Sequence, residues 1–151
     1  MNIYLACTVR GDRGAVAALR ALADDLERSG HTVLTRHLLD DDVDSAEASL
    51  SERAVYDRDI AWLTSADVLI ADASGSSYGV GFEVGYVLGR SEMSGQRVLL
   101  VYSAARRDVI SRLITGNAHP HCTTVAYTTP EDLLRQAEAF LGTLRSTDRV
   151  A

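Results

Sequence analysis

The stretch from residue 68 to residue 85 joins a strand-like run to a loop of small residues and then to the start of a helix. The run at 68–71, Val-Leu-Ile-Ala, is apolar and partly β-branched, which favours a buried strand. Ser76 and Ser77 follow it, and their hydroxyls add to the free N–H groups of a helix N-terminus, which attract anions. Three glycines come next, where the missing Cβ lets another backbone or a ligand approach closely: Gly79, Gly81 and Gly85. The stretch therefore predicts an anion-binding turn between a strand and a helix.

A single carboxylate, Glu83, lies in the first turns of this helix among apolar neighbours. Such a side chain is costly on an apolar helix unless it is paired or has a function. Its place beside the predicted anion-binding turn makes Glu83 a candidate for chemistry on a negatively charged ligand.

Strand-like and helix-like segments alternate along the chain, which is typical of an α/β protein with a parallel sheet. Residues 97–102 form a nearly continuous apolar run, as in strands that are buried on both faces. The expected strands are 2–7, 31–34, 67–72, 97–102 and 123–127. The expected helices are 14–29, 51–65, 79–92, 107–115 and one that starts at Thr129 and Pro130, with a frayed tail from Ser146 onwards.

This pattern fits a flavodoxin-like (Rossmann-like) three-layer sandwich, with a five-stranded parallel sheet in the order 2-1-3-4-5. Ligands of such sheets bind beyond the carboxyl ends of strands 1 and 3, where the strand order reverses. The loop after the first strand carries Arg10 and Arg13. We therefore expect these arginines to face Ser77 and Glu83 across one crevice.

Length and charge restrict the class of protein further. A chain of 151 residues indicates one domain, spanning 1–151. A net charge of −6 argues against a nucleic-acid-binding protein, which usually has a basic face. Two cysteines, Cys7 and Cys122, are too few for a disulfide framework. Because we find no charged leader and no apolar run of ~18 residues, we expect a cytoplasmic protein that does not bind membranes.

Several candidate residues have an ordinary structural interpretation beside the functional one. Arg10 and Arg13, on either side of Gly11, either bind a phosphate or are surface arginines at a helix start. Their spacing matches neither a Walker loop nor a GxGxxG fingerprint. Asp59 is either an exposed helix charge or a second carboxylate beside Glu83, as the cleavage of a glycosidic bond typically requires.

The remaining patterns are less informative. Tyr4 is either a buried strand tyrosine or points its hydroxyl at the mouth of the site. His119, His121 and Cys122 invite a metal interpretation, but they lie too close in sequence to close a tetrahedral shell without other ligands. The acidic run at 40–44 lacks the spaced ligands and central glycine of a calcium loop, so we expect a solvated loop there. No metal site is predicted.

Three segments together resemble the nucleoside 2-deoxyribosyltransferase superfamily, and within it the 2′-deoxynucleoside 5′-monophosphate N-glycosidases, with cytidine-monophosphate hydrolases as close relatives. They are 4–11 (Tyr-Leu-Ala-Cys-Thr-Val-Arg-Gly), 59–67 (Asp-Ile-Ala-Trp-Leu-Thr-Ser-Ala-Asp) and 77–85 (Ser-Tyr-Gly-Val-Gly-Phe-Glu-Val-Gly). The similarity extends from residue 2 to about 142. The chain departs from the family at Cys7 and Thr8, where Gly-Ser is frequent, so base preference and the choice between ribose and deoxyribose stay open.

The resemblance implies roles for individual residues. Glu83 would be the nucleophile that attacks C1′ of the sugar, Asp59 would orient it or handle the proton of the leaving base, and Tyr4 matches the family's first-strand tyrosine. Substrate-binding positions fall on both loops: Thr8, Val9, Arg10, Gly11, Arg13, Ser77, Gly79 and Gly81. Thr8, Arg10, Gly11 and Ser77 among them would bind the 5′-phosphate, joined by Ser111 from the neighbouring subunit of a homodimer. No metal or organic cofactor is implied.

The implied activity is hydrolysis of a (2′-deoxy)nucleoside 5′-monophosphate to the free base and (2-deoxy)ribose 5-phosphate, through a covalent glycosyl ester of Glu83. Two alternatives stay open. One is a deoxyribosyltransferase, which passes the sugar to another base. The other is a nucleotide-sensing module that binds without cleaving, although a pure binder has little reason to bury a carboxylate near a phosphate.

Overall fold

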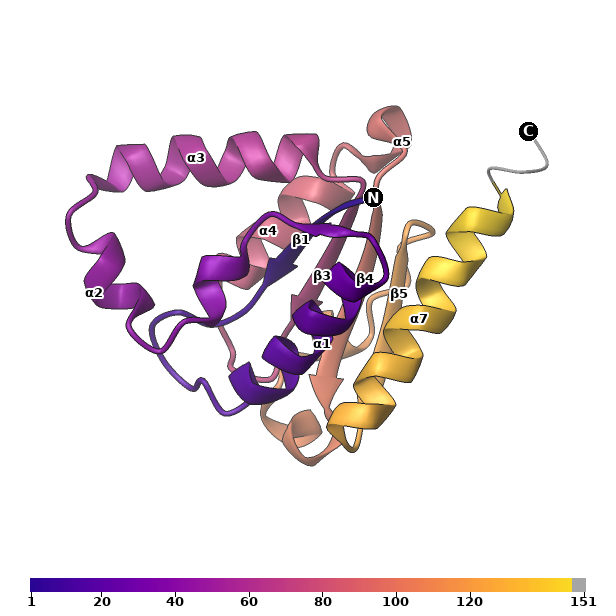
Figure 1. Cartoon of the computed structure of the whole chain (residues 1–151). Coiled ribbons are helices and arrows are strands. Elements are labelled where there is room, and N and C mark those ends of the chain that lie inside the picture. The colour runs from indigo at the N-terminus through magenta and orange to yellow at the C-terminus, as the bar shows by residue number, and fades with distance from the viewer. Residues whose placement is uncertain (148–151) are drawn as a thin grey trace.

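The computed structural model describes residues 1–147, which form a five-stranded sheet with helices on both faces (Figure 1). The strands are β1 (Asn2–Ala6), β2 (Thr32–Val33), β3 (Val68–Asp72), β4 (Arg97–Ser103) and β5 (Cys122–Tyr127). Their order is β2-β1-β3-β4-β5, and every neighbouring pair is parallel. The predicted α/β class and the strand order 2-1-3-4-5 are thus confirmed.

Helices and short helical turns connect the strands. The α-helices are α1 (Val16–Arg28), α2 (Val43–Glu47), α3 (Glu52–Ser65), α4 (Tyr78–Leu88), α5 (Ser91–Ser94), α6 (Arg112–Thr115) and α7 (Pro130–Thr147). Two 3₁₀ turns are η1 (Arg36–Leu39) and η2 (Ala104–Val109). Helices α1 and α7 cover one face of the sheet, while α3 and α4 cover the other (Figure 1).

The alternation of side chains along the strands produces two separate cores. Ile3 and Leu5 of β1 pack on the side of α1 and α7, whereas Tyr4 and Ala6 pack on the side of α3 and α4. Successive residues of a strand point to opposite faces, so a parallel sheet covered on both sides needs the continuous apolar runs that the sequence contains. Tyr4 is fully buried and brings a hydroxyl into the second core.

Helix ends follow local sequence signals. At the end of α1, the N–H of His31 donates to the carbonyl of Leu26 and that of Gly30 to Glu27, both at 3.0 Å. Gly30 has a φ of +83°, the left-handed conformation that this C-terminal motif requires. Helix α7 starts at Pro130 as expected, with the Thr129 hydroxyl accepting from a first-turn N–H.

Three expected segments differ from the structure. The expected helix at 107–115 is divided, because Ile110 is extended and Ser111 starts the separate helix α6. The expected helix at 79–92 ends at Leu88, and α5 follows as a short turn. The acidic stretch at 40–44, expected to be a solvated loop, contains the start of α2, since Val43 is buried in the core.

Other expectations concern the ends of the chain and its surroundings. Ser146 and Thr147, expected in the frayed tail, still belong to α7, and positions 148–151 lie outside the described residues. None of the helices within 1–147 is both long and apolar enough to cross a membrane. His119 and His121 stack edge to face, and no group of three or more potential metal ligands forms in the described part of the chain.

Candidate active site

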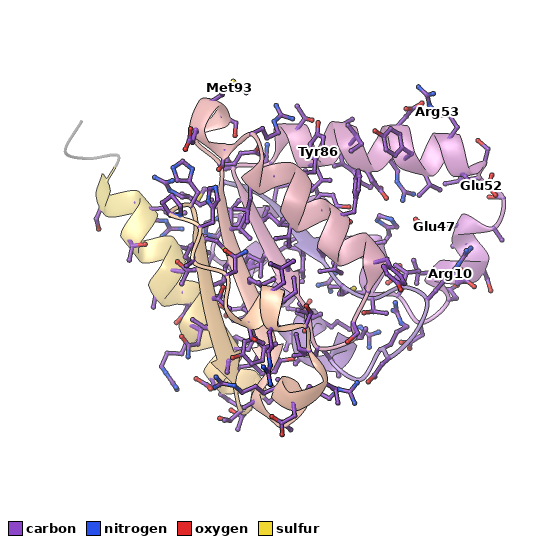
Figure 2. The ribbon with its side chains drawn as sticks, turned by 180° about the vertical axis from the view of Figure 1, so that it is seen from behind. Arg10, Glu47, Glu52, Arg53, Tyr86 and Met93 are labelled. Carbon is purple, nitrogen blue, oxygen red and sulfur yellow. The ribbon has the colours of Figure 1, made fainter. Side chains whose placement is uncertain are left out.

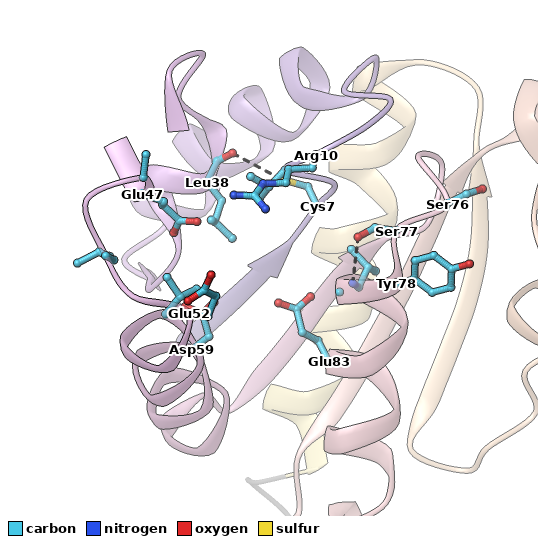
Figure 3. A pocket seen from close by; sticks show the side chains of 16 residues that line it. Cys7, Arg10, Leu38, Glu47, Glu52, Asp59, Ser76, Ser77, Tyr78 and Glu83 are labelled. Carbon is cyan, nitrogen blue, oxygen red and sulfur yellow. Dashed lines mark hydrogen bonds between the residues drawn. The ribbon is translucent and has the colours of Figure 1, made fainter. Parts of the chain in front are cut away.

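A cavity of about 840 Å³ opens at the carboxyl ends of β1 and β3, at the point where the strand order reverses (Figure 3). Its walls come from the loop after β1, from η1, α2 and α3, and from the N-terminal half of α4. The lining residues include four carboxylates: Glu47, Glu52, Asp59 and Glu83. The crevice lies where the topology rule places ligands in a doubly wound sheet.

Glu83 lies between the two ends of this cavity, with its carboxylate pointing inward (Figure 3). The hydroxyl of Tyr4 donates a 2.7 Å hydrogen bond to its Oε1 atom. Burial raises the pKa of Glu83 to about 7, and the nearby Asp59 carboxylate acts in the same direction. The hydrogen bond from Tyr4 opposes this shift, since it stabilises the ionised form. Glu83 is thus a carboxyl group that gains and loses its proton near neutral pH.

Tyr4, a residue of strand β1, is the hydrogen-bond partner of Glu83. Burial is the main cause that raises the pKa of Tyr4, and the negative charge of Glu83 adds to it. The phenol therefore stays protonated at neutral pH and acts as a hydrogen-bond donor. The structure brings the two residues together from segments 79 positions apart, β1 and α4.

Asp59 lines the same cavity from α3 and is fixed by its neighbour. Arg58 Nε donates to Asp59 Oδ1 at 2.9 Å, and a second guanidinium nitrogen of Arg58 donates to Oε1 of Glu47. The guanidinium carbon lies 5.0 Å from the centroid of the Trp62 ring, in a cation–π contact. Arg58 therefore holds two of the cavity's carboxylates in place.

The opposite end of the cavity offers groups for an anion. Ser77 caps α4, its Oγ accepting a 3.4 Å hydrogen bond from the N–H of Val80, and Gly79 also lines the cavity. Val9 and Arg10 enter from the loop after β1, and Arg10 lies toward α2, where its largely exposed side chain pairs with Asp44 at 2.7 Å. A helix N-terminus with a serine cap suits a phosphate, and an arginine on the loop across the cavity could turn toward it.

Other expected site residues lie outside the cavity lining. The guanidinium of Arg13 donates to the backbone carbonyls of Thr8, Leu38 and Asp40, so it ties the loop after β1 to η1 instead of facing Ser77. Thr8 is buried, and its hydroxyl has no hydrogen-bond partner within the described residues. Gly11 and Gly81 are exposed and do not line this cavity. Ser111 caps α6 and does not line the cavity either.

The glycine that allows a close approach of two loops is Gly75, which the sequence analysis did not single out. A Cβ at Gly75 would lie 2.1 Å from Thr8 Oγ1 and 2.5 Å from the Asp12 carbonyl oxygen. At Gly81 and Gly85, by contrast, an added Cβ would meet no atom within 4 Å. The loops after β1 and β3 can cross only because residue 75 has no side chain.

Sequence reasoning also missed the wall of the cavity formed by α2 and the start of α3. Glu47, Ala48, Leu50, Glu52 and Val55 line it. The short helix α2 begins within an acidic run, so its sequence resembles that of a loop. The one available signal was Val43, an apolar residue inside the acidic run that needs a buried position.

A five-stranded doubly wound sheet with two carboxylates, Asp59 and Glu83, in a cavity where the strand order reverses defines the structural class of this chain. Comparison with known proteins identifies its family. Residues 3–112 match the model of the nucleoside 2-deoxyribosyltransferase family. The chain is 38% identical over 141 residues to 2′-deoxynucleoside 5′-phosphate N-hydrolase 1 of Thermofilum pendens, with 93% of this chain and 95% of that protein covered. It therefore belongs to the nucleoside 2-deoxyribosyltransferase family, which confirms the resemblance.

Two further relatives extend the comparison. The 5-hydroxymethyl-dUMP N-hydrolase of Danio rerio is 35% identical over 117 residues, which cover 77% of this chain and 78% of that protein. The solved structure of the Clostridium botulinum CMP N-glycosidase BcmB superposes with a TM-score of 0.66 at 17% identity, covering 93% of this chain and 99% of the other. The structural match supports the shared fold.

Proposed function

We propose that the protein hydrolyses the N-glycosidic bond of nucleoside 5′-monophosphates to the free base and (2-deoxy)ribose 5-phosphate. The observation that carries this proposal is the buried Glu83 carboxylate, bound by Tyr4 and placed between a capped helix N-terminus and a second carboxylate, Asp59. The names of the curated relatives support the same reaction class. We further propose a cytoplasmic location, where the free Cys7 and Cys122 stay reduced.

The reaction would proceed in two displacements at C1′ of the sugar. Ionised Glu83 attacks C1′ while the bond to the base nitrogen breaks, and the leaving base takes up a proton from solvent that Asp59 relays. A water molecule then attacks C1′ of the glycosyl ester, gives its proton to Asp59, and releases Glu83 as a carboxylate. Two carboxyl groups suffice for retaining chemistry of this kind, so the proposal includes no metal or organic cofactor.

The 5′-phosphate would lie at the α4 end of the cavity. Backbone N–H groups at the start of α4 and the Ser77 hydroxyl are the donors available there, and the exposed Arg10 would leave Asp44 to reach the phosphate from the loop after β1. Thr8 and Gly11 would contribute through the shape of the loop after β1, because neither lines the cavity. This arrangement would favour monophosphates over free nucleosides.

We also propose that the protein is a homodimer in which Ser111 serves the partner's phosphate site. Ser111 is exposed beside two apolar side chains, Val109 and Leu113, and Leu113 is 83% exposed. Tyr78, next to Ser77, is fully exposed at 99%. Apolar side chains placed so openly on two segments are typical of a protein–protein contact.

Mixed dimers test this arrangement. Glu83→Gln and Ser111→Glu subunits, each inactive alone, would regain activity when mixed, because one site of each mixed dimer has both wild-type residues. Random exchange of subunits would make half of the dimers mixed. Because one of the two sites in each mixed dimer is intact, about a quarter of the wild-type activity would return. No recovery would mean that Ser111 serves its own subunit, and full activity of Ser111→Glu alone would remove it from the site.

The proposed reaction is tested with a panel of ribo- and deoxyribonucleoside 5′-monophosphates, following the free base by chromatography. We expect base release that Glu83→Gln abolishes while the variant keeps its fold. Added acceptor base distinguishes the deoxyribosyltransferase alternative, which would form a new nucleoside. Tight binding of a monophosphate without base release over hours would contradict hydrolysis and favour a nucleotide-sensing module.

A further inference from the structure

The end of the cavity away from Ser77 is rich in carboxylates. Figure 3 shows Glu47, Glu52 and Asp59 on one side of the cavity, Ser77 and Tyr78 on the other, and Glu83 between them. If the phosphate lies at Ser77 and the sugar over Glu83, as the proposed function requires, the base lies among these carboxylates. The inference below rests on that function.

Glu47 is the most firmly held of the carboxylates at this end. Its side chain is 15% exposed, and Oε1 accepts hydrogen bonds from Arg58 and from His37 Nε2, the latter at 3.4 Å. His37 in turn packs on the Trp62 ring, with centroids 5.3 Å apart. Seen from behind, Glu47 lies at the α2 end of the molecule near Arg10 (Figure 2).

The second oxygen of Glu47 is available to a ligand. Within the described residues, Oε2 accepts no hydrogen bond, although the side chain lines the cavity. Arg58 fixes the carboxylate through the other oxygen, beside its own positive charge. A fixed carboxylate oxygen at the base end accepts hydrogen bonds and repels carbonyl groups.

Nucleobases differ in what they present to such an oxygen. Cytosine and adenine carry an exocyclic amino group, at N4 and N6, which donates hydrogen bonds. Thymine and uracil carry the O4 carbonyl at the equivalent position, which only accepts. A carboxylate oxygen that is largely shielded from water would therefore pair with an amino base and would leave both partners unsatisfied with an oxo base.

We propose that Glu47, positioned by Arg58, reads the exocyclic amino group of the base, so that the substrate carries a 4-aminopyrimidine or a 6-aminopurine. Leucine and valine side chains that line the same cavity, Leu38, Leu50 and Val55, offer the ring apolar contacts. The cavity of about 840 Å³ accommodates either ring size. Glu47 acts on specificity and takes no part in bond breaking.

The test compares substrates that differ in one group. Wild-type protein would show a kcat/KM about 10- to 100-fold higher for CMP than for UMP, for dCMP than for dUMP, and for AMP than for IMP, as one hydrogen bond to a charged group provides. Glu47→Gln, which replaces one acceptor oxygen by a donor, would bring each ratio close to one. Asp57→Asn removes the same charge from the exposed face of α3, where Asp57 pairs with Arg53, and would leave the ratios unchanged.

The outcomes separate this inference from the proposed function. Equal rates on amino and oxo bases, or unchanged ratios in Glu47→Gln, would overturn the role of Glu47 and leave the hydrolase intact. Release of no base from any monophosphate would overturn the proposed function itself. A second readout needs no change at Glu47: in the Glu83→Gln variant, calorimetry would show tighter binding of CMP than of UMP, and equal affinities would count against the inference.

Discussion

The Tyr4 hydroxyl lies 2.7 Å from Oε1 of Glu83 and is its hydrogen-bond donor. The two residues come from the floor of the sheet and from the helix above the cavity, so the fold itself forms the pair. Burial raises the pKa of Glu83, while this hydrogen bond lowers it, and the result is a pKa of about 7. A nucleophile balanced in this way is ionised only in part at neutral pH, which has consequences for both activity and stability.

The first prediction concerns the pH dependence of activity. The nucleophilic form is the carboxylate, so kcat/KM for a monophosphate should fall about tenfold per pH unit below about 7. Tyr4→Phe removes the donor that favours ionisation and should move this limb to higher pH. Tyr102→Phe, another buried tyrosine of the same core, is the control. If kcat/KM instead began to fall only between pH 4 and 5, burial would not raise the pKa of Glu83.

The second prediction concerns stability. The pKa of Glu83 rises from an ordinary 4.5 in the unfolded chain to about 7 in the fold, so its stabilising effect is complete below pH 4.5 and is lost as pH rises through 7. Ionisation would then cost the wild type up to about 3 kcal/mol. Glu83→Gln stays neutral, so its gain in Tm over wild type should grow from pH 5 to pH 8. A constant difference would contradict this linkage.

The third prediction separates Arg10 from the rest of the site. Its ion pair with Asp44 is exposed, so a doubly charged phosphate should displace Asp44 readily. Arg10→Ala should raise KM for monophosphates at least about tenfold and leave the slow turnover of free nucleosides unchanged. Asp44→Asn breaks the same pair without removing the cation, so its KM should not rise. An equal loss on nucleosides would show that Arg10 does not bind the phosphate.

The fold was readable from the sequence because each element is locally consistent. The apolar run at 97–102 indicates a doubly covered parallel strand, and Thr129 with Pro130 marks a helix start without reference to distant residues. The breaks inside expected helices were less visible. Ile110 continues an apolar pattern in sequence, yet its extended backbone and the Ser111 cap end one turn and begin another.

Residues of the candidate site could be predicted from the sequence only where they belong to a recognisable motif. Glu83 and Ser77 belong to one glycine-rich segment, and Asp59 follows from the second helix, so all three could be named in advance. Arg13 shows the limit: its position in sequence suits a phosphate, but three nearby carbonyls compete for its guanidinium. Glu47 could not be found, because its place depends on how α2 packs beside η1.

The last prediction tests the crossing of the two loops that shape the cavity. A Cβ on Gly75 would lie 2.1 Å from Thr8 Oγ1, which could rotate away, and 2.5 Å from the carbonyl oxygen of Asp12, which belongs to the backbone and could not. Gly75→Ala should therefore lower the free energy of unfolding by about 1–3 kcal/mol and, by moving the loop that carries Arg10, raise KM for monophosphates.

A matched helix variant distinguishes this clash from a general effect of replacing glycine. An added Cβ at Gly85, in the exposed part of α4, meets no atom within 4 Å, so Gly85→Ala should raise the free energy of unfolding by about 0.5–1 kcal/mol through the better helix propensity of alanine. Chemical denaturation of both variants measures the two signs. If both variants were stabilised, the loops would have room to separate, and residue 75 would not need to be glycine. A loss of stability in Gly75→Ala together with a gain in Gly85→Ala would show that the close contact of the loops after β1 and β3 stabilises the cavity end of the sheet.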